Sequence, residues 1–229
     1  MKSIAIIPAR GGSKRIPRKN IIDFLGRPII AYTIDAAYES GVFERVVVST
    51  EDKEIAEVAL KSGAEVVWRS EKLAGDRVSV ADVCVDFLNS EQQNGRKYGM
   101  FCCLYAASPL RSAEDIRNVC SLLGPECHFS MAVTEYYFTP LGAFKYGNDG
   151  ALSLKWPELL FDPEERKKPL VVDNGSTYAA ETEYFLKEKN FFGDGLFGYR
   201  MPRERSVDID TFDDLMLAEL YAKASRGLI

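Results

Sequence analysis

The residues best suited to chemistry lie in one short segment, 10–20, directly after an apolar run. The segment reads RGGSKRIPRKN and holds five cationic side chains and no acidic one, in a chain of net charge -5. Its adjacent glycines, Gly11 and Gly12, let the backbone approach a ligand closely and present N–H groups to it. A glycine- and cation-rich loop after a first strand is typical of a polyphosphate site. A solvated basic turn is the simpler alternative, but it does not explain why glycines, cations and a strand end coincide.

The loop matches neither of the two common phosphate-binding motifs. Lys14 follows Gly12 and Ser13, with no earlier glycine at the spacing that a Walker A loop requires. A dinucleotide-binding loop opens directly into a helix, whereas Pro17 interrupts this one and the next helical pattern begins near Pro28. We therefore expect a long loop that wraps over its ligand.

Two carboxylates near the C-terminus form a second candidate site. Asp208 and Asp210 are two positions apart, so in an extended segment both side chains face the same side. Such a pair suits Mg²⁺, and either carboxylate could help to accept a proton from an attacking hydroxyl. The alternative is that Asp210 only caps the next helix, where Thr211 and Asp214 have capping-box spacing.

The elements that must position these residues alternate between strands and amphipathic helices. Short apolar strand patterns fall at 4–7, 46–48, 65–68, 100–104 and 129–133. Helical spacing of apolar residues falls between them, at 30–38, 55–59, 80–88 and 116–123. This alternation predicts an α/β fold with a mostly parallel sheet covered by helices on both faces. The length suits a single domain, 1–229.

One stretch, 136–172, interrupts this alternation. It combines prolines and turn signals with many large apolar side chains, including Phe138 and Trp156. A floppy surface loop would leave that apolar surface in water, so a dimerisation arm is the favoured interpretation.

Composition argues against several classes of protein. The chain has no run of about 18 apolar residues, so we expect no membrane partner, and its mild acidity argues against nucleic acid. The N-terminus enters a strand pattern directly, without the order of a signal peptide. The five cysteines are odd in number and lack Cys-x-x-Cys spacing, which predicts reduced thiols in a cytoplasmic protein rather than a zinc site.

The two motifs together resemble one family, the acylneuraminate cytidylyltransferases or CMP-sialic acid synthetases. The run PARGGSK at 8–14 followed by Pro-x-Lys-Asn at 17–20 is similar to their first signature, and RSVDIDT at 205–211 is similar to their second. The resemblance extends over residues 3–222. It implies a Rossmann-like three-layer nucleotidyltransferase fold and a homodimer paired through the extension. It also implies a Mg²⁺-dependent reaction in which a nine-carbon nonulosonic acid attacks CTP and pyrophosphate leaves.

The resemblance further implies roles for individual residues. The nucleotide-binding set is Arg10, Gly11, Gly12, Ser13, Lys14, Lys19, Asn20, Arg69 and Ser79. The catalytic set is Arg10, Lys19 and Asp208, and the metal ligands are Asp208 and Asp210. Such a reaction needs cations on the triphosphate and a metal held by carboxylates. Arg15 and Arg18 are either ligand contacts or solvated cations.

The sugar-binding set is Tyr105, Ser108, Arg166, Asn174, Gly175 and Tyr178. Sialic acid synthetases typically show QPTSPLR where this chain has YAASPLR at 105–111. Tyr105 in place of Gln removes an amide and Ala107 in place of Thr removes a hydroxyl, which changes the sugar groups that can be hydrogen-bonded. A tyrosine at position 105 resembles the pseudaminic acid branch. The Asn-Gly-x-x-Tyr segment at 174–178 instead favours sialic or legionaminic acid. Arg166 either meets the sugar carboxylate or faces a partner subunit.

Three alternatives stay open at this point. A CMP-Kdo synthetase or other sugar nucleotidyltransferase would resemble the first strand, although its loop differs from residues 12–20. A nucleotide-binding relative without catalysis would be expected to lack Lys19, Asp208 or Asp210, and all three are present. A structural subunit that assembles through the aromatic arm is the third.

Overall fold

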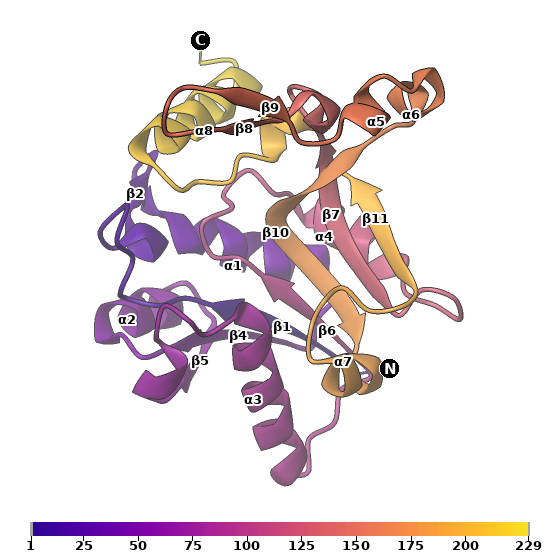
Figure 1. Ribbon diagram of the computed structural model, residues 1–229. Helices are drawn as coiled ribbons and strands as arrows, with labels where there is room; N and C mark the ends of the chain where they lie inside the picture. The colour runs from indigo at the N-terminus through magenta and orange to yellow at the C-terminus, as the bar shows by residue number, and fades with distance from the viewer. Residues whose placement is uncertain (1, 229) are drawn as a thin grey trace.

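The structure, a computed structural model, describes residues 2–228. Its centre is a seven-stranded sheet in the order β11-β7-β10-β6-β1-β4-β5 (Figure 1). The strands are β1 (Ser3–Pro8), β4 (Arg45–Thr50), β5 (Glu65–Trp68), β6 (Met100–Leu104), β7 (Phe129–Glu135), β10 (Val171–Glu181) and β11 (Leu196–Arg200). Neighbours are parallel except that β10 is antiparallel to β6 and β7. The mostly parallel sheet predicted from the sequence is therefore confirmed.

Side chains that alternate along the strands build a core on each face of the sheet. In β1, Ala5 and Ile7 join one core while Ile4 and Ile6 join the other, as the period of two requires. The first face is covered by α1 (Ile29–Ser40), α2 (Lys53–Lys61) and α4 (Ala113–Ser121), and the second by α3 (Val80–Gln93) and α7 (Thr182–Glu188). The result is the expected three-layer α/β architecture.

A third, smaller core joins segments from the two ends of the chain. Helix α8 (Phe212–Ser225) packs Leu215 and Ala218 against Ile16 of the loop after β1 and against Ile209. The helix begins with the predicted capping box, in which Thr211 and Asp214 bond reciprocally. This core places the two sequence motifs side by side.

The stretch 136–172 forms an extension that leaves the sheet between β7 and β10. It contains the hairpin β8 (Phe144–Tyr146) and β9 (Leu152–Leu154), then α5 (Pro157–Leu160) and α6 (Pro163–Lys167). It lies at the top of the view, where the hairpin is drawn across α8 (Figure 1). Phe138, Tyr146 and Phe161 are 89%, 79% and 73% exposed. This apolar surface suits an arm, while pairing through it stays a prediction.

The remaining elements are short. They are β2 (Asp23–Phe24), β3 (Arg27–Pro28) and the 3-10 turns η1 (Lys19–Ile21), η2 (Glu71–Leu73), η3 (Pro140–Gly142) and η4 (Arg203–Arg205). All five cysteines are buried free thiols, in agreement with the sequence prediction. Within residues 2–228, no helix is both long and apolar enough to cross a membrane.

Candidate active site

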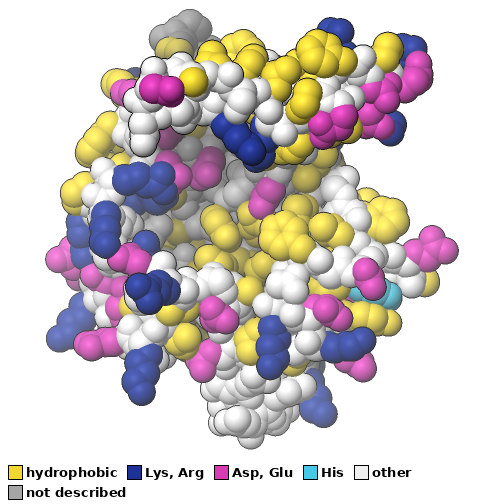
Figure 2. All heavy atoms as spheres, viewed as in Figure 1, with side chains coloured by type: hydrophobic (Ala, Val, Ile, Leu, Met, Phe, Trp, Pro, Cys, Tyr) yellow, Lys and Arg dark blue, Asp and Glu magenta, His cyan; other side chains and the backbone are white. Residues whose placement is uncertain are grey.

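A cleft opens where loops follow the C-terminal ends of β1, β5 and β6. Its outer part has a volume of about 430 Å³ and its deeper part about 90 Å³. The two parts share Lys19, Asn20, Val80 and Tyr105, so they form one continuous hollow. On the face shown in Figure 2 the surface is hollowed at the centre, and Lys and Arg side chains gather along the rim. This location is the usual ligand-binding edge of an open α/β sheet.

Hydrogen bonds from its own backbone and from a buried amide fix the shape of the glycine-rich loop. The buried Asn20 donates from Nδ2 to the Arg10 carbonyl at 2.9 Å, which closes the loop on itself. The Gly11 N–H donates to Glu51 Oε1 at 2.7 Å. A side chain at Gly11 would collide with Asp52, so this position requires glycine. Asn20 is thus placed to shape the loop.

Four of the five loop cations line the outer cleft, and carboxylates hold all four in pairs. Asp76 receives Arg10 Nη1 at 3.0 Å and Lys14 Nζ at 2.5 Å, one on each oxygen. These contacts, with Lys14 first, hold the pKa of Asp76 below its usual range. The Asp76 carboxylate binds between two cations, and an anionic phosphate could take the same place because it would accept the same charge-assisted hydrogen bonds.

Asp210 gathers the other pair of cations. Its Oδ1 lies 2.8 Å from Arg15 Nη2 and 3.1 Å from Lys19 Nζ, and the same Nζ donates to the Ile209 carbonyl at 2.7 Å. Lys19 therefore connects the N-terminal motif directly to the C-terminal one. The sequence did not decide whether Arg15 contacts a ligand, and the structure places it in the lining of the outer cleft.

Arg18 points away from the cleft. It adopts a left-handed backbone conformation, with φ of 59°, and its guanidinium pairs with Asp52 and Glu54 at the start of α2. Its role is to anchor the loop to that helix. Arg18 is therefore neither a ligand contact nor a free solvated cation, the two alternatives that the sequence offered.

Asp208 lies in the deeper part of the cleft. Burial, and then the nearby charge of Asp210, raises the pKa of Asp208. Among residues 2–228, no group donates a hydrogen bond to its carboxylate and no cation pairs with it. A solvent-accessible carboxylate without a partner, at the base of a cleft, is suited to a cation.

The donor set around Asp208 and Asp210 fits Mg²⁺. Mg²⁺ is commonly held by one or two protein carboxylates and completes its shell with water and substrate phosphates. The described part of the chain has no cluster of three or more His, Cys, Asp or Glu side chains that could hold a metal alone. The two aspartates would hold the ion together with a bound nucleotide.

Arg69 and Ser79 line a side hollow of about 200 Å³ that also contacts Arg10 and Asp76. The Arg69 Nε donates to Glu51 Oε2 at 2.9 Å, and its buried Nη2 forms an ion pair with the same oxygen at 2.8 Å. Glu51 therefore fixes Arg69 at the edge of this hollow. Ser79 is already engaged, because its hydroxyl caps α3 in a reciprocal box with Asp82.

The opposite wall of the cleft is aromatic and buried. The Tyr105 and Tyr178 rings lie 5.2 Å apart, and burial raises the pKa of both phenols. Ser108 is buried and lines the deeper part, as does Gly175, which has a φ of +65°. The structure thus brings four residues of the predicted sugar set together.

Asn174 supports this wall from behind. Its Nδ2 donates to Ser206 Oγ at 3.0 Å, and its Oδ1 accepts from Ser176 Oγ at 2.7 Å. These bonds tie β10 to the C-terminal motif. The amide is therefore placed to support the binding wall.

Residues 4–133 match the protein family described as Cytidylyltransferase. A pseudaminic acid cytidylyltransferase of Campylobacter jejuni is 37% identical over 231 residues, which span 99% of this chain and 98% of that protein. This chain belongs to the cytidylyltransferase family.

Two further comparisons agree with that assignment. An N-acylneuraminate cytidylyltransferase of Streptococcus agalactiae is 35% identical, over 94% of this chain and 52% of that longer protein. A CMP-2-keto-3-deoxy-manno-octonic acid synthetase, solved in complex with CTP, has a TM-score of 0.72 at 15% identity, covering 99% of this chain and 100% of that one. The sequence-based family prediction and the nucleotidyltransferase fold are confirmed. The protein is a CTP-dependent nucleotidyltransferase.

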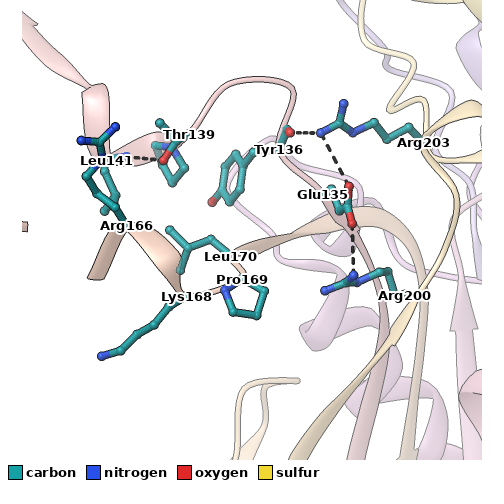
Figure 3. A pocket seen from close by; sticks show the side chains of 11 residues that line it. Glu135, Tyr136, Thr139, Leu141, Arg166, Lys168, Pro169, Leu170, Arg200 and Arg203 are labelled. Carbon is teal, nitrogen blue, oxygen red and sulfur yellow. Dashed lines mark hydrogen bonds and ion pairs between the residues drawn. The ribbon is translucent and has the colours of Figure 1, made fainter. Parts of the chain in front are cut away.

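One predicted sugar residue of this cytidylyltransferase lies elsewhere. Arg166 is on α6 and lines a different hollow, of about 270 Å³, between the extension and the ends of β7 and β11. Figure 3 shows it apart from Glu135, which pairs with Arg200 and Arg203. Within one chain, Arg166 does not reach the cleft.

Sequence reasoning did not assign several residues that organise the cytidylyltransferase site. Glu51 and Asp76 face the loop, Asp173 precedes the Asn-Gly pair, and Arg111 lies under the aromatic wall. Arg111 is buried, donates to the Ser176 carbonyl at 2.6 Å, and has its pKa lowered by burial to about 10. Asp76 ends the run Leu-Ala-Gly-Asp at 73–76, a sequence pattern that could have marked it as a site residue. Its pairing with Arg10 and Lys14 depends on the fold and could not be predicted from the sequence.

Proposed function

We propose that this cytidylyltransferase transfers CMP from CTP to the anomeric hydroxyl of a nonulosonic acid, and that the acid is pseudaminic acid. The observation that carries the proposal is the layout of the cleft, with a cationic loop on one side, an aromatic wall on the other, and Asp208 between them. The Campylobacter relative supports pseudaminic acid, and Tyr105 supports the same sugar.

Charge neutralisation is the main work of the loop in this proposal. Arg10 and Lys14 would leave Asp76 and bind the outer phosphates, while Lys19 would turn from Asp210 to the phosphate under attack. The backbone N–H of Gly12 adds a donor near these cations, while that of Ser13 donates to the Gly11 carbonyl at 3.0 Å. Removing one donor that acts in the transition state costs about 10²–10³ in rate in comparable sites.

Asp208 and Asp210 would hold Mg²⁺, and the side hollow with Arg69 would receive the nucleoside. When bound, the ion neutralises charge on phosphate oxygens. The departure of Lys19 and Arg15 toward phosphate frees Asp210 for this role. An Asp208 oxygen that is not bound to the ion would lie in the deeper part of the cleft and could take the proton of the sugar hydroxyl.

A homodimer in the cytoplasm completes the proposal. The exposed apolar residues of the extension support pairing with a second copy, and Arg166 would then face the partner's cleft. The free thiols support a reducing compartment.

The test is pyrophosphate release from CTP and Mg²⁺ with pseudaminic, N-acetylneuraminic, legionaminic and Kdo acids. We expect turnover with pseudaminic acid and its loss in Asp210→Ala. Asp213→Ala is the matched control, because Asp213 is an exposed carboxylate in the first turn of α8. Turnover with a different acid would overturn the sugar assignment, and no turnover with any acid would overturn the reaction.

A further inference from the structure

Strand β10 is irregular where it passes the cleft. Its register against β7 shifts between Asp173 and Tyr178, so the intervening residues bulge from the sheet. Gly175 occupies the centre of this bulge with a φ of +65°. A bulge beside a cleft re-aims side chains, but it loses ladder hydrogen bonds and needs other contacts to hold one shape.

The Asp173 carboxylate supplies those contacts. Its Oδ1 accepts the Gly175 N–H at 2.9 Å, and the Tyr178 hydroxyl lies 2.8 Å from each of its oxygens. A carboxylate that accepts from a phenol forms a charge-assisted hydrogen bond, which is stronger than a neutral one. One exposed side chain thus closes both ends of the bulge.

Both groups held by Asp173 belong to the proposed sugar end. Gly175 lines the deeper cleft so closely that a Cβ there would be 3.4 Å from Asp208 Cγ. The Tyr178 ring packs at a tilt against that of Tyr105, which lines both parts of the cleft. The position of Asp173 therefore couples the floor of the pocket to its aromatic wall.

We infer that Asp173 is a positioning residue for the sugar acid, acting through the Gly175 turn and the Tyr178 hydroxyl. The inference rests on the proposed assignment of this end of the cleft to the sugar. Among residues 2–228, the Asp173 carboxylate accepts hydrogen bonds only from Gly175 and Tyr178 and pairs with no cation of the loop, so it leaves CTP binding to the loop. Folding alone does not require a charged group here, because the adjacent Asn174, Ser176 and Arg111 already tie β10 to its surroundings.

The experiment compares Asp173→Ala, Asp173→Asn and Tyr178→Phe in the full chain with Mg²⁺. We expect Asp173→Ala to raise KM for the sugar acid at least tenfold while KM for CTP stays within about twofold. Asp173→Asn retains an oxygen acceptor and should recover most of the loss. The double variant Asp173→Ala with Tyr178→Phe should lose less than the product of the single effects, because both remove the same bond.

Hydrogen exchange gives a second readout that needs no turnover. Asp173→Ala should speed exchange in residues 174–178 and leave residues 10–20 unchanged. Equal rises in both KM values, or a general loss of protection, would show a purely structural role and overturn the inference. Unchanged kinetics and exchange would overturn it too. Absence of turnover in the wild type would reject the proposed function, while the exchange result would still judge the Asp173 contacts.

Discussion

The glycine-rich loop and the opposite wall of the cleft use charge in different ways. In the loop, the ion pairs on Asp76 are exposed, with Lys14 and Asp76 side chains 77% and 50% accessible. Under the opposite wall, Arg111 and Asn174 are buried and bonded on several sides, and Asp115 is fully buried against Arg205. Exposed pairs contribute little and exchange partners easily, whereas buried ones are costly to break.

This difference fits the two kinds of ligand. A triphosphate arrives with its own negative charge and can replace Asp76 and Asp210 as the partner of the loop cations. A sugar acid offers hydroxyls and a ring, and its recognition depends on a wall of fixed shape. The loop is therefore suited to exchange and the wall to positioning.

The largest effect is expected from removing the cation that joins the two motifs. Lys19→Ala should lower kcat about 10²–10³-fold, because Lys19 pairs with Asp210 and is the loop cation that lines the deeper part of the cleft with Asp208. Arg18→Ala, one residue away but turned toward Asp52, should lower kcat by no more than about threefold. Steady-state rates of pyrophosphate release measure both. Equal losses in the two variants would mean that the loop acts as a unit.

Breaking a buried pair under the wall should mainly cost stability. Arg205→Ala strands the buried Asp115 carboxylate and should lower the free energy of unfolding by about 2–4 kcal/mol. Arg200→Ala, which breaks an exposed pair with Glu135, should cost less than about 0.5 kcal/mol. Urea unfolding at pH 7 measures both changes.

The Arg205→Ala loss should depend on pH. Burial alone raises the pKa of Asp115, but the Arg205 and Ser112 hydrogen bonds bring it below the usual value of 3.8. The native pair therefore adds stability above about pH 4 and loses it as the pH falls. Without Arg205 the buried carboxyl favours its protonated form, so the deficit should be larger at pH 7 than at pH 4. A deficit that is constant with pH would contradict this account.

Substituting Gly175 tests whether the shape of the wall matters, and its expected cost in stability is smaller than that of Arg205→Ala. Gly175→Ala forces a side chain into a positive-φ position beside Asp208 and should cost about 1–2 kcal/mol of stability. Gly227→Ala has the same φ of +65° but no neighbour within 4 Å, so it controls for backbone strain. Thermal unfolding should shift in both variants, while kcat should fall only in Gly175→Ala. A fall in kcat in Gly227→Ala would contradict the expectation that only the substitution at Gly175 affects activity.

The smallest effect is expected at the exchangeable pairs. Asp76→Asn removes the anion that competes for Arg10 and Lys14, so CTP should bind about two to five times more tightly in calorimetry, with the gain shrinking at high salt. Asp86→Asn, an exposed carboxylate on α3, should change nothing. Weaker binding in Asp76→Asn would show that Asp76 organises the cations and that exchange is the wrong description.

The sequence allowed the two motifs and most of the layers to be predicted because both depend on local patterns. β5 and β6 have the predicted bounds, and the Thr211 capping box is present. Strand β10 was not predicted, since its pairing with β6 and β7 joins segments far apart in the chain. The partners of Asp76, Arg111 and Asp173 depend on that long-range packing, and no spacing in the sequence encodes them.

The small core beneath α8 has a consequence for synthesis. Ile16 and Ile209 meet there only after α8 is present to bury them both. A ribosome-bound chain that has made every strand still lacks the surface that seats Asp208 and Asp210 against Lys19. The enzyme would thus gain its activity only once α8 has been made, and chains that stop before residue 212 would consume no CTP.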